Sequence, residues 1–370
     1  MRARRTVLLL AACALGASAW ASGPVATVAG ADLPVRLSDA EFWRVVEQFS
    51  EPNGYFRSDN LVSNEDTFQF VIPTLIATVR PGGVYLGVGP DQNFTYIAAV
   101  QARLAFIPDI RRGNLHLHLM YKALFELSAD RAEFLSRLFS RPRPDGLGAA
   151  SSPAALFAAY ANVPASREHF DRNVGDVVAQ LRDRHGFALD EADLAGIAGV
   201  YSSFYEAGPY LRYSNTQSRW RSRYPSFQDL QLADDGRGTN RGYLATERAF
   251  RFLKQLQERN LIVPLVGNFA GPRALRAVGE YVRSRGGTVT TYYTSNVEQY
   301  LFQDGLWEAF AGNLATLPTD ASSTLIRSCF NNCANGGYRS WSLLDSIRPL
   351  VDDARAGRIR MYWDVLARSR

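Results

Sequence analysis

A pair of glycines, followed by a carboxylate twenty residues later, gives the strongest chemical signal in this sequence. The apolar run Val84–Val88 leads into Gly87-Val88-Gly89, and Asp109 follows Gly89 by twenty residues. Glycine tolerates positive φ and lets a ligand approach the backbone, and an acid at about this spacing binds ribose hydroxyls in dinucleotide sites. Gln92 stands where that fingerprint has its third glycine, so the pattern is incomplete. We therefore predict a strand, a glycine turn, a helix and a second strand with the geometry of a nucleotide site.

The residues after Gly89 limit what this turn could hold. Asp91, Gln92 and Asn93 begin the helix that follows it. A helix N-terminus favours anions, but Asp91 already places a negative charge there and would repel a phosphate. A phosphate ligand is therefore disfavoured. Two interpretations stay open, a ligand loop that includes Gly87, Gly89 and these three residues, or a tight turn that Asp91 caps.

Asp109 and Arg111 form the second candidate set. Pro108 cannot donate to a sheet ladder, so the strand Leu104–Ile107 should end there and leave Asp109 at its carboxyl edge. Asp109 could accept hydrogen bonds from two ribose hydroxyls, while Arg111 offers a fork to a carboxylate. The alternative is an ion pair between the two side chains at the edge of the sheet.

Polar residues also follow two later predicted strands. Asn268 comes after the apolar run Leu261–Val266, and a second group follows or ends the β-branched and aromatic run Thr288–Tyr293. Ligands of doubly wound sheets bind outside the carboxyl ends of the strands. We therefore expect these residues to line a substrate or ligand pocket: Asn268, Tyr293, Ser295, Asn296 and Glu298.

Metal and hydrolase chemistry have little support. His116 and His118 point about 200° apart on a helix, so they cannot share one metal ion, and we predict no metal site. No G-x-S-x-G elbow, H-E-x-x-H pair or P-loop lysine occurs. A secreted hydrolase therefore ranks third among the functions we consider.

The candidate residues need a sheet that brings them to one edge. Strands alternate with helices both before residue 129 and after residue 260, which favours a mostly parallel sheet with helices on both faces. Residues 129–210 contain a series of helix-like runs, which we interpret as a helical insertion between the second and third strands. The run Ser323–Cys329 could be a further strand. The predicted fold is α/β and Rossmann-like.

The N-terminus predicts export. Residues 1–21 contain three arginines, the apolar run Thr6–Ala19 and an A-x-A site, which together are typical of a signal peptide cleaved after Ala21. A lipoprotein modified at Cys13 is the lesser alternative. Cys329 and Cys333 have three residues between them and could form a small disulfide, although two unpaired thiols remain possible. We predict a periplasmic or secreted protein with no transmembrane span in the mature chain.

The net charge limits the kinds of partner that we expect, and the length of the chain limits the number of domains. Removal of the signal takes away three arginines, which leaves 38 basic against 36 acidic residues and a net charge of +2, so no nucleic-acid partner is implied. We expect a tether over residues 22–37 and one α/β domain over residues 38–345 that includes the insertion. The remaining residues, 346–370, should form a C-terminal extension packed on that domain.

Five segments resemble an uncharacterised bacterial family whose fold is like that of S-adenosylmethionine-dependent methyltransferases. The likeness covers roughly Phe49 to Cys329 and rests on FSEPNGYFRSDNLVSNED, GVYLGVGPDQNFTYIAA, DIRRGNLHLHLMYKALFELS, NLIVPLVGNFAGPRALRAVGEYV and TYYTSNVEQYLF. The resemblance implies that Gly87 and Gly89 form the loop beside the methionine part of the cofactor and that Asp109 binds its ribose. It places Ser295-Asn296 where substrate-facing polar residues occur.

Two hypotheses for function follow. The first is an exported protein with a methyltransferase-like Rossmann core that binds a small ligand or a surface partner, without demonstrated catalysis. The second is an active methyltransferase of unknown substrate, with S-adenosylmethionine as its cofactor. Tyr85-Leu86 replaces the acidic residue with which the glycine motif of such enzymes begins, and an exported chain would meet little of this cytoplasmic cofactor. Likeness of fold alone does not decide function.

Overall fold

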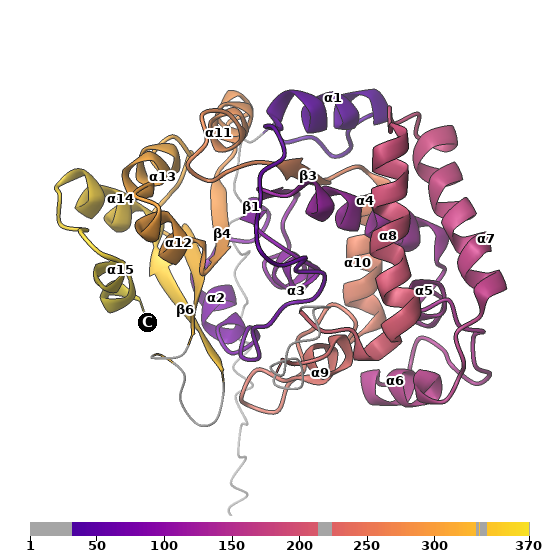
Figure 1. Cartoon of the computed structure of the whole chain (residues 1–370). Helices are drawn as coiled ribbons and strands as arrows, with labels where there is room; N and C mark the ends of the chain where they lie inside the picture. Colours follow the sequence, from indigo (N-terminus) through magenta and orange to yellow (C-terminus); the bar gives the residue numbers. More distant parts are fainter. Residues whose placement is uncertain (1–31, 214–223, 331–332, 334–338, 370) are drawn as a thin grey trace, which may run out of the picture.

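The fold is built around one six-stranded sheet with helices packed against it (Figure 1). The structure, a computed structural model, describes residues 32–213, 224–330, 333 and 339–369. The strand order is β3-β2-β1-β4-β5-β6, in which β1 to β5 pair in parallel and β6 runs antiparallel to β5. The strands are β1 Val84–Gly87, β2 Leu104–Asp109, β3 Ile262–Val266, β4 Val289–Ser295, β5 Thr324–Phe330 and β6 Ser340–Ser346. The predicted α/β fold with a mostly parallel sheet is thus confirmed, and the antiparallel edge strand β6 was not predicted.

The central strands are buried on both faces. Every residue of β1, β2 and β3 is buried, and successive residues of a strand point to opposite faces, so both faces of this part of the sheet are covered. Pro108 lies inside β2 rather than after its end, where it pairs with Leu265 of β3. The pairing of β1 with β2 reaches only Leu86 and Phe106, so Pro108 lies where β2 has a single neighbouring strand. Asp109 is the last residue of β2, at the carboxyl edge.

Helices surround the sheet, and several begin at side-chain caps. Ser38 forms a capping box with Glu41 at the start of α1, as the local sequence Ser38-Asp39-Ala40-Glu41 favours. The helices are α1 Asp39–Phe49, α2 Ile72–Thr78, α3 Gln92–Ala99, α4 Arg112–Leu127, α5 Arg131–Leu138, α6 Pro153–Ala161, α7 Arg167–Val178, α8 Glu191–Ala207, α9 Phe227–Leu232, α10 Glu247–Glu258, α11 Ala274–Ser284, α12 Val297–Gln303, α13 Trp307–Leu314, α14 Ile347–Arg355 and α15 Tyr362–Arg368, with the π-helix η1 Ala179–Arg184 and the 3₁₀ turn η2 Gly208–Tyr210.

Helices α4 to α10 all lie between β2 and β3 in the chain. Figure 1 shows α7 and α8 at one side of the molecule and β6, α14 and α15 at the opposite side. The connection from β2 to β3 is therefore a large helical block, and its first helix, α4, packs directly on β3 and β2.

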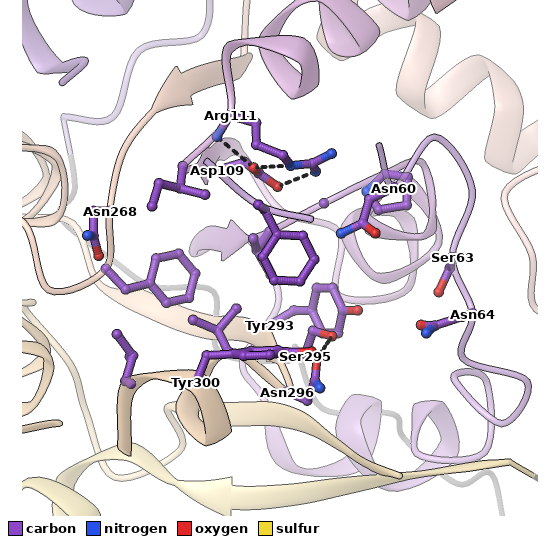
Figure 2. Close-up of a pocket in the computed structure, with 18 of the residues that line it drawn as sticks. Asn60, Ser63, Asn64, Asp109, Arg111, Asn268, Tyr293, Ser295, Asn296 and Tyr300 are labelled. Carbon is purple, nitrogen blue, oxygen red and sulfur yellow. Dashed lines mark hydrogen bonds and ion pairs between the residues drawn. The ribbon is translucent and has the colours of Figure 1, made fainter. Parts of the chain in front are cut away.

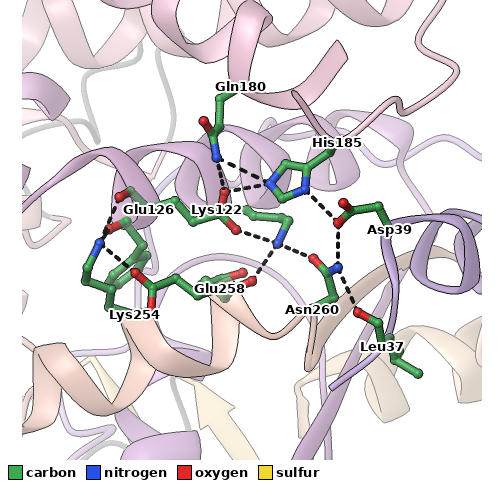
Figure 3. A network of polar contacts seen from close by, with 11 residues as sticks. Leu37, Asp39, Lys122, Glu126, Gln180, His185, Lys254, Glu258 and Asn260 are labelled. Carbon is green, nitrogen blue, oxygen red and sulfur yellow. Dashed lines mark hydrogen bonds and ion pairs between the residues drawn. The ribbon is translucent and has the colours of Figure 1, made fainter. Parts of the chain in front are cut away.

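A buried polar network fastens this block to the N-terminal helix α1 (Figure 3). Lys122 of α4 donates to Glu126 Oε1 at 2.7 Å and to Asn260 Oδ1, which precedes β3, at 2.5 Å. His185 follows η1, and its Nε2 lies 2.7 Å from Glu126 Oε2 while its Nδ1 lies 2.7 Å from Asp39 Oδ1 of α1. Four segments distant in sequence are thereby joined by charge-assisted hydrogen bonds.

The far end of the sheet has its own buried ion cluster. Arg327 of β5 pairs with Glu298 of α12 at 2.7 Å and with Asp345 of β6 at 3.0 Å, and all three are buried. Its guanidinium also contacts Ser369, just after α15. The chain after β6 forms α14 and α15, and this cluster holds the end of α15 against β5 and α12.

The two remaining cysteines are bonded to each other. Cys329 and Cys333 form a disulfide with their Cα atoms 5.5 Å apart, as one of the two sequence interpretations predicted. Among the described residues no helix has both the length and the apolar character needed to cross a membrane. The predicted signal peptide and Cys13, together with most of the predicted tether, lie outside the described residues.

Candidate functional site

A cavity of about 200 Å³ opens at the carboxyl edge of the sheet (Figure 2). The residues that follow β1, β2, β3 and β4 all contribute to its wall, and residues 55–65 close it from another side. The strand order reverses between β1 and β4, so the cavity lies at the topological switch point, where open α/β sheets bind their ligands.

The structure brings together many of the residues singled out in the sequence. These line the cavity: Gly89, Asp109, Arg111, Asn268, Tyr293, Ser295 and Asn296. Others lie behind its wall: Gly87, Asp91, Gln92, Asn93 and Glu298. Glu298 in particular points away into the ion pair with Arg327.

The two glycines of the motif serve different purposes. A Cβ on Gly87 would lie 2.6 Å from the Tyr85 hydroxyl and closer still to Asn93 Oδ1, so this glycine permits close packing inside the protein. Gly89 has a φ of +76°, and a Cβ there would meet nothing within 4 Å. Gly89 is therefore required by backbone conformation, and of the two it is the one that faces the cavity.

Polar side chains behind the glycine turn hold it in place. Asn93 Nδ2 donates to the carbonyls of Val88 at 2.9 Å and Pro90 at 2.7 Å. His118 Nε2 lies 2.8 Å from the Gly89 carbonyl, and burial lowers the pKa of this imidazole to about 4. His118 is thus neutral at pH 7 and donates from Nε2. Asn93 and His118 thus fix the backbone conformation of the turn, and it is this backbone that faces the cavity.

Asp91 has a buried environment of its own. It occupies the N-cap position of α3 but makes no side-chain cap hydrogen bond, in contrast to the capped turn that the sequence allowed. Its Oδ2 instead accepts from the Tyr243 hydroxyl at 3.0 Å and from Gln231 Nε2 at 3.0 Å. Burial raises the pKa of Asp91 to about 7, because these hydrogen bonds only partly offset the lost solvation. Asp91 therefore joins the start of α3 to Gln231 of α9 and to Tyr243, and it does not line the cavity.

Asp109 and Arg111 form the ion pair that was one of the two alternatives. Asp109 Oδ1 accepts from the Arg111 backbone N–H at 2.9 Å and from its Nε at 3.0 Å, while Oδ2 accepts from Nη2 at 2.9 Å. Arg111 Nη1 donates to the carbonyl of Ser58 at 3.1 Å and also to that of Asp59. Both carboxylate oxygens of Asp109 thus accept hydrogen bonds from Arg111. Through its bonds to Ser58 and Asp59, Arg111 also links the loop of residues 55–65 to the end of β2.

Glu65 is a site residue that sequence reasoning missed. Its side chain is almost fully buried, and its Oε1 accepts from the Tyr293 hydroxyl at 2.7 Å and from Ser295 Oγ at 2.5 Å. Its Oε2 accepts from Gln92 Nε2 at 2.8 Å. Three of the predicted site residues therefore converge on one carboxylate. Glu65 lies in a polar loop without periodicity, so only its place in the quoted FSEPNGYFRSDNLVSNED segment could have drawn attention to it.

Ser295 has an unusual backbone conformation. Its φ is +52°, in the left-handed region that non-glycine residues rarely adopt. The register of β4 against β5 shifts between Tyr293 and Ser295, which is a bulge in the strand. Such outliers persist where the surrounding structure enforces them, and they cluster at functional sites. Here the bulge turns the Ser295 hydroxyl toward Glu65.

Aromatic residues form the rim of the cavity. Phe56 packs edge-on against Tyr300 of α12 with ring centroids 5.3 Å apart, and Arg57 donates to the Tyr300 hydroxyl. Tyr55 also lines the cavity, yet it is 85% exposed. Asn60 lies beside them with a φ of +49°, and its buried Oδ1 has no hydrogen-bond partner among the described residues. A buried acceptor without a partner is costly, so it is a natural contact for a bound ligand.

The charges around the cavity are few. Among the described lining residues, Arg111 is a cation and Glu65, Asp109 and Asp304 are anions. Because Arg111 is paired with Asp109, the remaining charge is negative, and the cavity disfavours anionic ligands. No group of three or more His, Cys, Asp and Glu side chains placed to hold a metal ion occurs in the part of the chain that the structure describes.

The chain is therefore an α/β protein with a small cavity at the switch point of its sheet. The chain belongs to a family described as a domain of unknown function, DUF7790, whose model matches residues 60–148 and 210–341. Those segments contain β1 to β5, the first two residues of β6 and the cavity wall from Asn60 onward. The unmatched residues between them contain α6, α7, η1 and α8. No curated protein matches the chain.

Proposed function

We propose that this protein is an exported binder of a small organic molecule that is uncharged or cationic, held in the cavity at the carboxyl edge of a methyltransferase-like Rossmann core. The observation that carries the proposal is the convergence of four strand ends on one cavity that contains a buried, unpartnered Asn60 Oδ1. Aromatic walls and a few placed polar groups are typical of small-molecule sites.

The lining supports this ligand class. Tyr55, Phe56 and Tyr300 offer apolar faces, while Asn60 and Asn296 offer amide groups for hydrogen bonds. An anion would meet carboxylates without a free cation to pair with, which argues against phosphate and carboxylate ligands. Export is supported by the disulfide, since such bonds persist in oxidising compartments.

Ligand capture tests the proposal directly. Protein purified from its own host and analysed by native mass spectrometry should carry a small molecule, and a structure of that material should have density beside Gly89 and Asp109. Asn296→Trp should fill the cavity and remove the bound mass, whereas Asn162→Trp at an exposed helix end should not. A cavity that is empty in host-purified protein, with no added mass, would contradict the proposal.

An active S-adenosylmethionine-dependent methyltransferase is the second candidate, because Gly89 and Asp109, to which the family resemblance assigns this cofactor, line one cavity. The ion pair speaks against it, since the ribose would have to displace Arg111 from both oxygens of Asp109. Calorimetry on the mature chain decides between the two. No heat with S-adenosylmethionine or S-adenosylhomocysteine agrees with the first proposal, whereas micromolar binding that Asp109→Ala abolishes would establish the second.

The site of cleavage tests export. Mass spectrometry of the protein recovered from cells should find Ser22 at the N-terminus. A lipid on Cys13 would show a lipoprotein instead, and an intact Met1 in protein from the cytoplasm would contradict export.

A further inference from the structure

The strand-to-helix turn at Ser295 has the features of a nucleophile site. Ser295 ends β4, one of the two middle strands of the sheet, and α12 begins two residues later. In serine hydrolases built on parallel sheets, the nucleophile sits on a sharp, strained turn of this kind, which lifts its hydroxyl above the sheet edge. Ser295 has a comparable local conformation, because its φ is +52° and a bulge in β4 directly precedes it.

A carboxylate lies where a general base is needed. Ser295 Oγ is 2.5 Å from Glu65 Oε1, within the reach required for proton transfer between a nucleophile and its base. Tyr293 and Gln92 hold the two oxygens of Glu65 at 2.7 and 2.8 Å, so the carboxylate is fixed in orientation. Ser295 and Asn296 both line the cavity, so a bound molecule would meet the hydroxyl directly.

We propose that Ser295 is a nucleophile activated by Glu65, and that it cleaves a small, uncharged or cationic carboxylic ester bound in the cavity. This inference rests on the proposed small-molecule site and adds a covalent step to it. Glycines are absent two residues to either side of Ser295, where Tyr293 and Val297 stand, which is why a motif search of the sequence does not find this turn.

The reaction proceeds in two balanced steps. Ser295 Oγ bonds to the ester carbonyl carbon while its proton passes to Glu65; the bond from that carbon to the alcohol oxygen then breaks, and the alcohol leaves with the proton. Water next adds to the acyl carbon and gives a proton to Glu65. The bond to Ser295 Oγ then breaks, the carboxylic acid departs, and the serine takes the proton back.

Asn296 supplies a group for the oxygen that becomes negative in each step. Its Oδ1 lies 3.4 Å from Ser295 Oγ, so its amide is adjacent to the reacting atoms (Figure 2). The oxygen and nitrogen of an amide exchange places by rotation, and an Asn N–H is among the donors that stabilise such oxyanions.

Covalent labelling tests the proposal. The mature protein is incubated with diisopropyl fluorophosphate, a small uncharged reagent for activated serines, and the adduct is located by intact mass and peptide mapping. We expect one adduct, on Ser295, and turnover of p-nitrophenyl acetate. Ser295→Ala should abolish both, and Ser284→Ala, at an exposed helix end, should change neither. Glu65→Gln should slow labelling at least about 100-fold, the usual minimum contribution of a general base.

A second variant keeps the test decisive if Ser295→Ala does not fold. Ser295→Gly should fold, because glycine accepts a positive φ without strain, and it too should remain unlabelled. No adduct on Ser295, or an adduct elsewhere, overturns the nucleophile. If a host-derived ligand is nevertheless found in the cavity, the proposed binding function survives that failure; an empty cavity removes both.

Discussion

Replacement of Asp91 by asparagine should stabilise the protein, and the gain should depend on pH. Asp91 is only 2% exposed, and the groups that contact its carboxyl are neutral, namely Tyr243 and Gln231. Asparagine has nearly the same shape and retains an oxygen that accepts both hydrogen bonds, but it never ionises. The substitution therefore removes the cost of a buried charge and leaves the packing in place.

The size of the effect follows from the pKa. The pKa of Asp91 rises from 3.8 to about 7 on folding, which at ~1.4 kcal/mol per unit amounts to about 4 kcal/mol. Below pH 4 both states hold the proton and ionisation costs nothing. Between pH 4 and 7 the folded state keeps a proton that the unfolded chain releases, so stability falls as pH rises. Above pH 7 the full penalty applies.

Urea denaturation at several pH values between 4 and 8 measures the prediction. The unfolding free energy of Asp91→Asn should match that of the unaltered protein near pH 4 and exceed it by about 4 kcal/mol at pH 8. Asp145→Asn, in an exposed turn, is the control and should show no such trend. If Asp91→Asn is no more stable than the unaltered protein at pH 8, Asp91 is not the buried acid described above and our account of its environment is wrong.

Three other predictions concern stability. Burial alone would raise the pKa of Glu126, but contacts with His185 and Lys122 outweigh it and lower that pKa from 4.5 to about 2. Glu126→Gln should therefore lower the free energy of unfolding, measured by urea denaturation at pH 7, by about 3 kcal/mol. That loss should shrink as pH falls from 4.5 toward 2, and a loss independent of pH would refute this account. Gly87→Ala should lower the free energy of unfolding by about 3 kcal/mol through overpacking, and Gly89→Ala by about 1 kcal/mol through backbone strain. Calorimetric melting of the two variants measures this, and a larger loss for Gly89→Ala would contradict it. Reduction of the Cys329–Cys333 bond should lower the unfolding free energy by about 2 kcal/mol, and a much larger drop would mean that the disulfide does more than close a short loop.

The helical block between β2 and β3 gives the family match a structural meaning. The cavity lies within the matched residues apart from Tyr55 and Phe56, whereas α6, α7, η1 and α8 fall in the unmatched stretch. If the family shares a function, the cavity is where it resides. The network around Lys122 and His185 then serves to attach the additional helices to the shared core.

Local patterns in the sequence were enough to predict the parallel sheet, the cap of α1 at Ser38 and the edge at which Gly89 and Asp109 meet. These features depend on local signals, namely runs of apolar residues, a capping box and a glycine turn, each contained within a few neighbouring residues. The alternation of strands and helices then fixes the direction of the strands, and with it the edge where their carboxyl ends gather.

Which side chains meet at that edge depends on the packing of elements that are distant in the sequence. Glu65 and Ser295 are 230 positions apart, and nothing in the local pattern of either residue indicates the other. In the same way, only the fold shows that Arg111 occupies both oxygens of Asp109 and that Glu298 turns away to Arg327. A side chain's partner depends on how whole elements pack, because burial makes each polar group pair with whatever donor or acceptor the fold brings within reach.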